Sequence, residues 1–149
     1  MAGSRESVRI EGIDPLLRKL AALPDEIQQG ADDAAEVIAT DEAQRIQAAS
    51  RTAGRRAALA GRSVRARQGS SPAVVGGGTG RLPNGTGTFG DLFFGAEFGG
   101  GARKTTQQFE PHRGRTGYWF WPQLRADEDR IADEWTAVID TVVKDWEAR

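Results

Sequence analysis

Apolar residues recur at helical spacing in two long stretches of the chain. The first stretch opens at Pro24 with acids in its first turn, and the second follows Pro122. Successive steps in both are three or four residues or sums of these, which predicts amphipathic helices. The apolar positions are Ile27, Ala31, Ala34, Ile38, Ile46 and Ala49 in the first stretch, and Leu124, Ile131, Trp135, Val138, Val142 and Trp146 in the second. We therefore expect a long, Ala-rich helix and one terminal helix.

Shorter patterns predict the remaining elements. Val8-Arg-Ile10 is typical of a short strand, and the segment from Asp14 to Leu23 predicts a short helix that ends at Pro24. The aromatic run from Phe89 to Phe94, together with Phe98, predicts a strand and its continuation. Residues 100–117 are predicted as a loop, and Tyr118 to Trp121 as a strand or an aromatic entry to the terminal helix.

Residues 50–88 have a different character, rich in glycine and arginine. Val64 and residues 73–75 could form strands, but Gly76-Gly-Gly-Thr-Gly80 and Asn84-Gly-Thr-Gly87 interrupt regular structure. We expect a long arm or hairpin here, inside a single domain that spans residues 1–149.

The net charge of −1 conceals a segregation of charge along the chain. Residues 1–50 carry 5 Lys or Arg against 10 Asp or Glu, residues 51–115 carry 11 against 3, and residues 116–149 carry 4 against 8. A basic middle between acidic ends suits a contact between subunits or an anionic partner such as DNA. There is no Cys, no secretory signal and no apolar run long enough to cross a bilayer, so we expect a soluble protein without a membrane partner.

The sequence offers little for catalysis. His112 is the single histidine and has no obvious carboxylate or nucleophile beside it. Gly85-Thr-Gly-Thr-Phe-Gly90 matches a phosphate-loop spacing, but it follows loop and enters a segment predicted as strand, so we interpret the match as chance. We expect no enzyme activity, no catalytic residue, no cofactor and no metal site.

The arginines of the middle segment are the main candidates for binding. They occur without an intervening acid and could pair with acids of a neighbouring subunit or face DNA: Arg51, Arg55, Arg56, Arg62, Arg65 and Arg67. No helix-turn-helix, zinc-finger or RNP signature accompanies them. A second set, mostly aromatic, is predicted to form the packing core: Leu92, Phe93, Phe94, Phe98, Trp119, Trp121, Leu124, Ile131 and Trp135.

Several short motifs follow one another in an order that indicates a family resemblance. Val8-Arg-Ile-Glu-Gly12 and Leu17 to Leu20 precede Leu23-Pro24 and the long helix, and the arginine segment, Glu97-Phe98-Gly99 and Trp121-Pro-Gln-Leu124 follow it. This order resembles the tail-completion or head-tail connector (neck) family, small morphogenesis proteins of long-tailed bacteriophages. The chain departs from the family after the long helix, where members commonly carry a Pro and a Thr-Gly-x-Leu.

The resemblance implies a fold and a function. The fold would be α+β, with a small, mostly antiparallel sheet flanked by the long helix and the C-terminal helix, and a Gly/Arg-rich arm. The function would be structural: a homo-oligomer, a sixfold ring, at the head-tail junction of the virion. It would be made in the host cytoplasm and would contact neighbouring neck or tail proteins and, non-specifically, DNA in the channel. A tail terminator ring that caps the tail tube and, from another class, an Arg-rich DNA-binding module remain as alternatives.

Overall fold

The computed structural model describes residues 24–69, 72–100 and 109–148. In this part of the chain the fold is α+β and mostly helical, with one small antiparallel sheet. The strand expected at Val8–Ile10 and the helix expected before Pro24 lie outside the described residues. The elements are α2 (Asp25–Thr52), α3 (Arg55–Gly61), β1 (Arg65–Arg67), β2 (Ala73–Val75), α4 (Phe89–Phe98), the 3-10 helix η1 (Gly114–Thr116), α5 (Phe120–Ala126) and α6 (Glu128–Glu147).

The long helix predicted from its spacing is confirmed as α2. It begins after Pro24, and Asp25 and Glu26 in its first turn complement the positive end of the helix dipole. It ends where Gly54 takes a φ of 122°, a conformation that glycine adopts without a steric penalty. Gly54 also precedes α3, so the chain turns sharply there and α3 packs back on α2.

Residues 50–88 contain more regular structure than an extended arm. The C-terminal turn of α2 and all of α3 lie in this segment, and β1 pairs with β2 in the register Arg65↔Val75, Ala66↔Val74 and Arg67↔Ala73. The strands proposed near Val64 and at residues 73–75 therefore exist. The helix α3 was not predicted, because its apolar stretch is short and lies between arginines. Ala57, Leu59 and Ala60 of this stretch pack in or against the core.

The aromatic run after Thr88 forms the helix α4, so the prediction of a strand there is wrong. Thr88 caps this helix, because its Oγ1 accepts from the Asp91 N–H at 3.2 Å while Asp91 Oδ2 accepts from the Thr88 N–H at 2.9 Å. This capping box gives hydrogen-bond acceptors to two backbone N–H groups at the start of the helix, which have no partner within the helix itself. Local capping and packing therefore outweigh the strand preference of phenylalanine.

The terminal helix is divided in two. Residues 118 and 119 have no regular structure, so no strand forms at Tyr118–Trp121; α5 begins at Phe120, and a break at Asp127 separates it from α6. The apolar stripe that begins at Leu124 thus spans two helices.

The core lies where α2, α3, β1, α4 and α5 converge. Its buried members are mostly small or aromatic: Ala43, Ile46, Ala57, Ala60, Val64, Leu82, Leu92, Trp119 and Phe120. Phe93 packs edge-on against Trp119 and Phe120, with ring centroids 5.3 and 5.5 Å apart. These T-shaped contacts add to the burial of apolar area.

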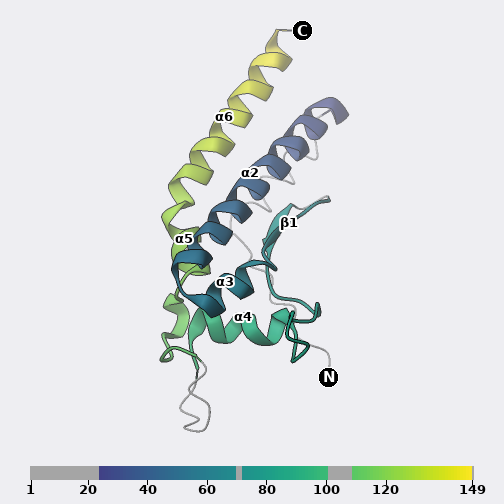
Figure 1. Cartoon of the computed structure of the whole chain (residues 1–149). Coiled ribbons are helices and arrows are strands. Elements are labelled where there is room, and N and C mark those ends of the chain that lie inside the picture. Colours follow the sequence, from purple (N-terminus) through teal and green to yellow (C-terminus); the bar gives the residue numbers. More distant parts are fainter. Residues whose placement is uncertain (1–23, 70–71, 101–108, 149) are drawn as a thin grey trace.

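Two helices project beyond this core. Figure 1 shows α2 and α6 running side by side in opposite directions, away from the region that holds α3, α4 and β1. We call residues 25–40 of α2 and 133–147 of α6 the distal arm. Each segment extends over roughly 20–24 Å at 1.5 Å per residue.

Candidate interaction surface

The six arginines predicted to contact a partner are all exposed. They lie at the end of α2, in and just after α3, and in β1, and these elements pack on one another. No acid occurs between Glu42 and Asp91. Within residues 24–69, 72–100 and 109–148, no ion pair joins any of the six to an acid. We call Arg51, Arg55, Arg56, Arg62, Arg65 and Arg67 the arginine surface.

An aromatic side chain accompanies these charges. The Arg56 guanidinium carbon lies 5.7 Å from the centre of the Phe109 ring, within the range of a cation-π contact. Phe94, on the neighbouring α4, is 46% exposed. The arginine surface therefore has apolar area beside its positive charge.

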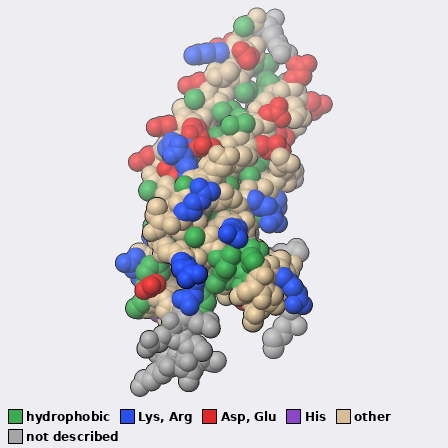
Figure 2. Space-filling view, viewed as in Figure 1, with side chains coloured by type: hydrophobic (Ala, Val, Ile, Leu, Met, Phe, Trp, Pro, Cys, Tyr) green, Lys and Arg blue, Asp and Glu red, His purple; other side chains and the backbone are tan. Residues whose placement is uncertain are grey.

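The distal arm carries the opposite charge. It holds ten acids and one basic residue, Lys144. Figure 2 shows Asp and Glu gathered where α2 and α6 extend, and Lys and Arg gathered over the rest of the molecule. The segregation noted along the sequence is thus also a segregation in space.

Apolar side chains are exposed on the distal arm as well. Val37, Val143 and Trp146 are 69%, 44% and 59% exposed, and α6 has no fully buried residue after Ile131. A shallow, open groove of about 530 Å³ runs along α2 and is lined by Asp33, Glu36, Val37, Thr40, Asp41 and Gln44. Its rim is acidic, and Val37 supplies apolar surface within it.

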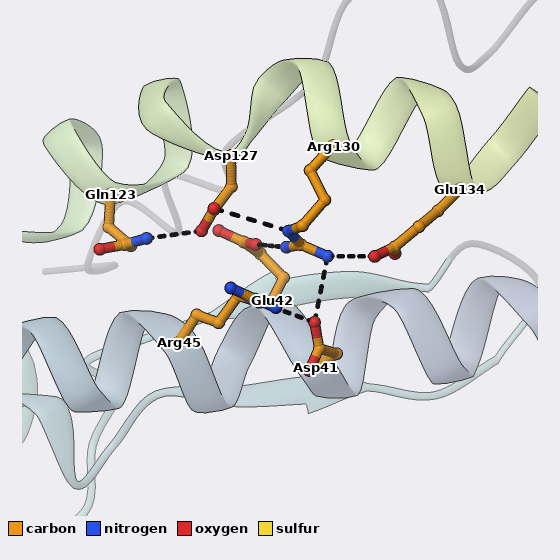
Figure 3. Close-up of polar contacts among 7 residues, drawn as sticks. All are labelled: Asp41, Glu42, Arg45, Gln123, Asp127, Arg130 and Glu134. Carbon is orange, nitrogen blue, oxygen red and sulfur yellow. Dashed lines mark hydrogen bonds and ion pairs between the residues drawn. The ribbon is translucent and has the colours of Figure 1, made fainter.

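A cluster of charges joins α2 to α5 and α6 at the base of the arm (Figure 3). Arg130 is the cation that α6 contributes to this cluster. The guanidinium of Arg130 contacts Glu42 Oε2 at 2.5 Å, Asp41 Oδ2 at 3.0 Å and Asp127 Oδ1 at 3.5 Å. It also contacts the carboxylate of Glu134. Gln123 donates to Asp127 Oδ2 at 2.6 Å. One cation thus serves four carboxylates, two of them buried: Glu42 and Asp127.

Burial and charge shift the acids of this cluster in different directions. Burial, followed by the charge of Asp127, raises the pKa of Glu42 from 4.5 to about 7, although Arg130 opposes the shift. The hydrogen bond from Arg45 lowers the pKa of Asp41. Glu42 Oε1 is buried without a hydrogen-bond partner. Asp127 lies at the break between α5 and α6, is buried, and pairs with Arg130.

Glu97 holds a second junction, between α4 and α5. It is fully buried, and its carboxylate accepts the backbone N–H groups of Trp119 at 3.1 Å, Phe120 at 2.8 Å and Trp121 at 2.9 Å. These donors lie at the start of α5, where a helix leaves N–H groups without internal partners. The Glu97-Phe98-Gly99 motif is therefore structural at Glu97.

Two glycines permit this junction. A Cβ on Gly117 would lie 2.0 Å from Glu97 Oε1, and one on Gly99 would lie 2.2 Å from the Pro111 carbonyl oxygen. Both glycines also have positive φ, 71° and 81°. Any side chain at either position would force the backbone apart.

The phosphate-loop match enters a helix after all, because Gly90 lies in α4. Its backbone donors are nevertheless occupied: the N–H groups of Phe89 and Gly90 bond to the carbonyls of Gly80 and Gly78, and those of Thr88 and Asp91 complete the capping box. An anion would find no free donor there, and Asp91 would repel it. This N-terminus therefore differs from phosphate-binding helix N-termini, whose backbone N–H groups point at the anion.

The predicted packing core divides into three groups. Leu92, Trp119 and Ile131 are buried, Phe93 and Leu124 pack against the core, and Phe98, Trp121 and Trp135 are half-buried. Phe94 is exposed, so its place in the predicted core is wrong. Two residues apart, Leu92 and Phe94 would share one face of a strand, but in a helix they point in nearly opposite directions.

The described residues provide no site for metal chemistry. No group of three or more His, Asp or Glu side chains among them is placed to hold a metal ion, and His112 is exposed. None of the described helices is both long and apolar enough to cross a membrane. The buried charges instead join helices to one another.

The residue patterns that singled out the arginines did not single out Arg130, Glu42 or Glu97. Their signal was a carboxylate or guanidinium close to apolar positions of amphipathic helices, which sequence alone does not distinguish from a solvated charge. No protein-family model, curated protein or solved structure matches the chain.

Proposed function

We propose that this protein is a structural virion protein of a phage neck or tail. It forms a ring of identical subunits at the head-tail junction, where it completes the tail or joins it to the head. The supporting observation is the arginine surface, which is exposed and has no acidic partner within the described part of its own chain. A surface of this kind serves a contact with another molecule.

Three further observations support assembly over catalysis or free DNA binding. Glu42 and Glu97, buried carboxylates of the described residues, join helices to one another through an ion pair and through backbone hydrogen bonds. The opposite charges lie in different regions, as a heterologous contact in a closed ring requires. The net charge of −1 gives DNA no long-range attraction to the molecule as a whole. The proposed partners are further copies, then neighbouring neck or tail proteins; a tail terminator would present the same ring to a different neighbour.

The test is the mass of the purified protein by light scattering, with co-purification of tail or capsid proteins. Wild type should form a defined ring, or enter tails or connectors as a subunit. The variant R55E/R62E should fold normally and remain monomeric, because like charges would meet across the contact. Arg56 is left in place because its guanidinium lies over Phe109.

The matched control is R81E/R115E, which changes the net charge equally at two exposed arginines outside the arginine surface. It should assemble as wild type does. Normal assembly of R55E/R62E would contradict the role of the arginine surface. A monomer that ignores tails and capsids but binds duplex DNA, with affinity falling steeply as salt rises, would replace the proposal by the DNA-binding alternative.

A further inference from the structure

The distal arm has the properties of a surface that another molecule covers. Val37, Val143 and Trp146 are exposed on it, and Trp135, Val138, Ile139 and Val142 are half-buried. The apolar side of α2 is buried at Ala31, Ala35, Ile38 and Ala39, with Val37 exposed beside it, whereas α6 has no fully buried residue after Ile131. Contiguous exposed apolar surface rimmed by charge is typical of an interface.

The charge of the arm identifies the kind of partner. The ten acids on two adjacent helices repel one another with only one lysine among them, and a positively charged partner would relieve this repulsion. At the base of the arm the chain supplies Arg130 and Arg45 as countercharges, but within the part of the chain that the structure describes the groove acids Asp33 and Glu36 form no ion pair. Asp33 accepts a hydrogen bond from Gln29.

The arginine surface matches this requirement in both charge and apolar character. It presents six exposed arginines without acidic partners in the described part of the chain, and Arg56 lies over the ring of Phe109. In β1, the side chains of Arg65 and Arg67 are both exposed with Ala66 between them, so the two arginines point from the same face of the strand. The arginine surface is thus basic where the distal arm is acidic, and the two surfaces have complementary charge.

We infer that the distal arm receives the arginine surface of a second copy of this chain, head to tail. The inference rests on the proposed function and adds to it the acceptor half of the contact, centred on Asp33, Glu36 and the exposed apolar residues of α2 and α6. Because donor and acceptor surfaces differ, each copy has one of each left to bind further copies. The contact is heterologous and propagates until the ring closes.

Complementary charge reversals test this inference. R55E/R62E replaces two of the six arginines of the arginine surface by glutamates, which would meet the acidic groove, and D33K/E36K places two lysines in the groove, where they would meet the arginine surface. Each variant alone should lose association by about a hundredfold or more and behave as a monomer in analytical ultracentrifugation, since like charges meet. Mixed in equal amounts, they should regain the assembly of wild type, because every contact again joins opposite charges.

The control is E110K/D129K, which changes the net charge by the same amount at two exposed acids outside the distal arm. It should assemble as wild type does and should not restore assembly of R55E/R62E. Circular dichroism of every variant reports folding independently of assembly.

The outcomes separate the inference from the proposed function. If D33K/E36K assembles normally while R55E/R62E does not, the arginine surface has another acceptor and the inference fails while the proposed function stands. Recovery that stops at a two-fold dimer would overturn the head-to-tail contact. If wild type is monomeric, ignores tails and capsids and binds duplex DNA through Arg55 and Arg62, both the inference and the proposed function fail.

Discussion

Glu42 is a carboxyl group that the fold buries to 2% exposure between α2 and α6. Arg130 pairs with one of its oxygens, while the other has no hydrogen-bond partner in a site that also contains Asp127. Burial and the charge of Asp127 together outweigh the charge of the guanidinium and raise the pKa of this carboxyl. A buried cluster with more acids than cations favours a bound proton.

The raised pKa of Glu42 predicts how stability depends on pH. A carboxyl whose pKa is about 7 in the folded protein and 4.5 otherwise binds protons more tightly when folded. The free energy of unfolding should therefore fall as pH rises from 4.5 to 7, by up to about 3 kcal/mol. The variant E42Q should flatten this fall and gain roughly 1–2 kcal/mol over wild type at pH 8, because a neutral amide avoids the buried charge.

Urea unfolding between pH 5 and 8 measures this dependence. The control is E134Q, which removes a more exposed partner of Arg130 and should keep the slope of wild type. Asp41, whose pKa is lowered, contributes only at more acidic pH and does not enter this window. An E42Q protein with an unchanged slope would show that Glu42 stays ionised throughout.

At the scale of elements, spacing predicted the helices that have one long apolar stripe, and local chemistry decided the others. The pattern from Ile27 to Ala49 was sufficient for α2, because small apolar residues recur over many turns. α4 was predicted as a strand since phenylalanine favours strands, yet Thr88 and Asp91, three residues apart, already carried the capping-box signal. The break at Asp127 had no comparable signal, since it depends on contacts with α2.

The junction between α4 and α5 yields a prediction of its own. Glu97 accepts three backbone N–H groups at the start of α5, where Trp119 and Phe120 enter the core. The variant E97A should lower the free energy of unfolding by about 2–4 kcal/mol, because buried donors would lose a charged acceptor. E97Q should lose less stability than E97A, because its amide oxygen still accepts a hydrogen bond. It should remain less stable than wild type, because its NH₂ group faces other donors.

Chemical denaturation followed by far-ultraviolet circular dichroism measures this loss. E110A is the matched control, because Glu110 is exposed and should change stability by less than about 0.5 kcal/mol. If E97A were as stable as E110A, the three hydrogen bonds at α5 would contribute nothing net to folding.

At the scale of the whole molecule, the proposed assembly depends on where charge lies and not on its total. The sequence predicted the candidate arginines and the opposition of charge along the chain, but their distribution in space depends on tertiary packing. The turn at Gly54 folds α3 onto α2, and the antiparallel course of α6 places its acids beside those of α2. Neither follows from residue spacing, and so the acceptor surface on the distal arm emerged only from the fold.

This arrangement predicts a change at Trp146 on assembly. The side chain is 59% exposed at the far end of α6, and Trp119, by contrast, is 2% exposed in the core. If the arginine surface of a second copy covers the arm, acrylamide should quench the fluorescence of Trp146 less in the mixture of R55E/R62E with D33K/E36K than in either variant alone. Acrylamide is chosen because it is neutral, whereas the acidic arm would repel iodide by itself.

The same mixture made with W146F in both variants assigns the signal, since only the contribution of Trp146 is removed. Protection that disappears with W146F places the apolar part of the arm inside the contact, where its burial adds to the attraction of opposite charges. Assembly without any change in quenching would restrict the contact to the acidic groove around Asp33 and Glu36. The exposed end of α6 would then be free within the ring to meet the neighbouring neck or tail protein.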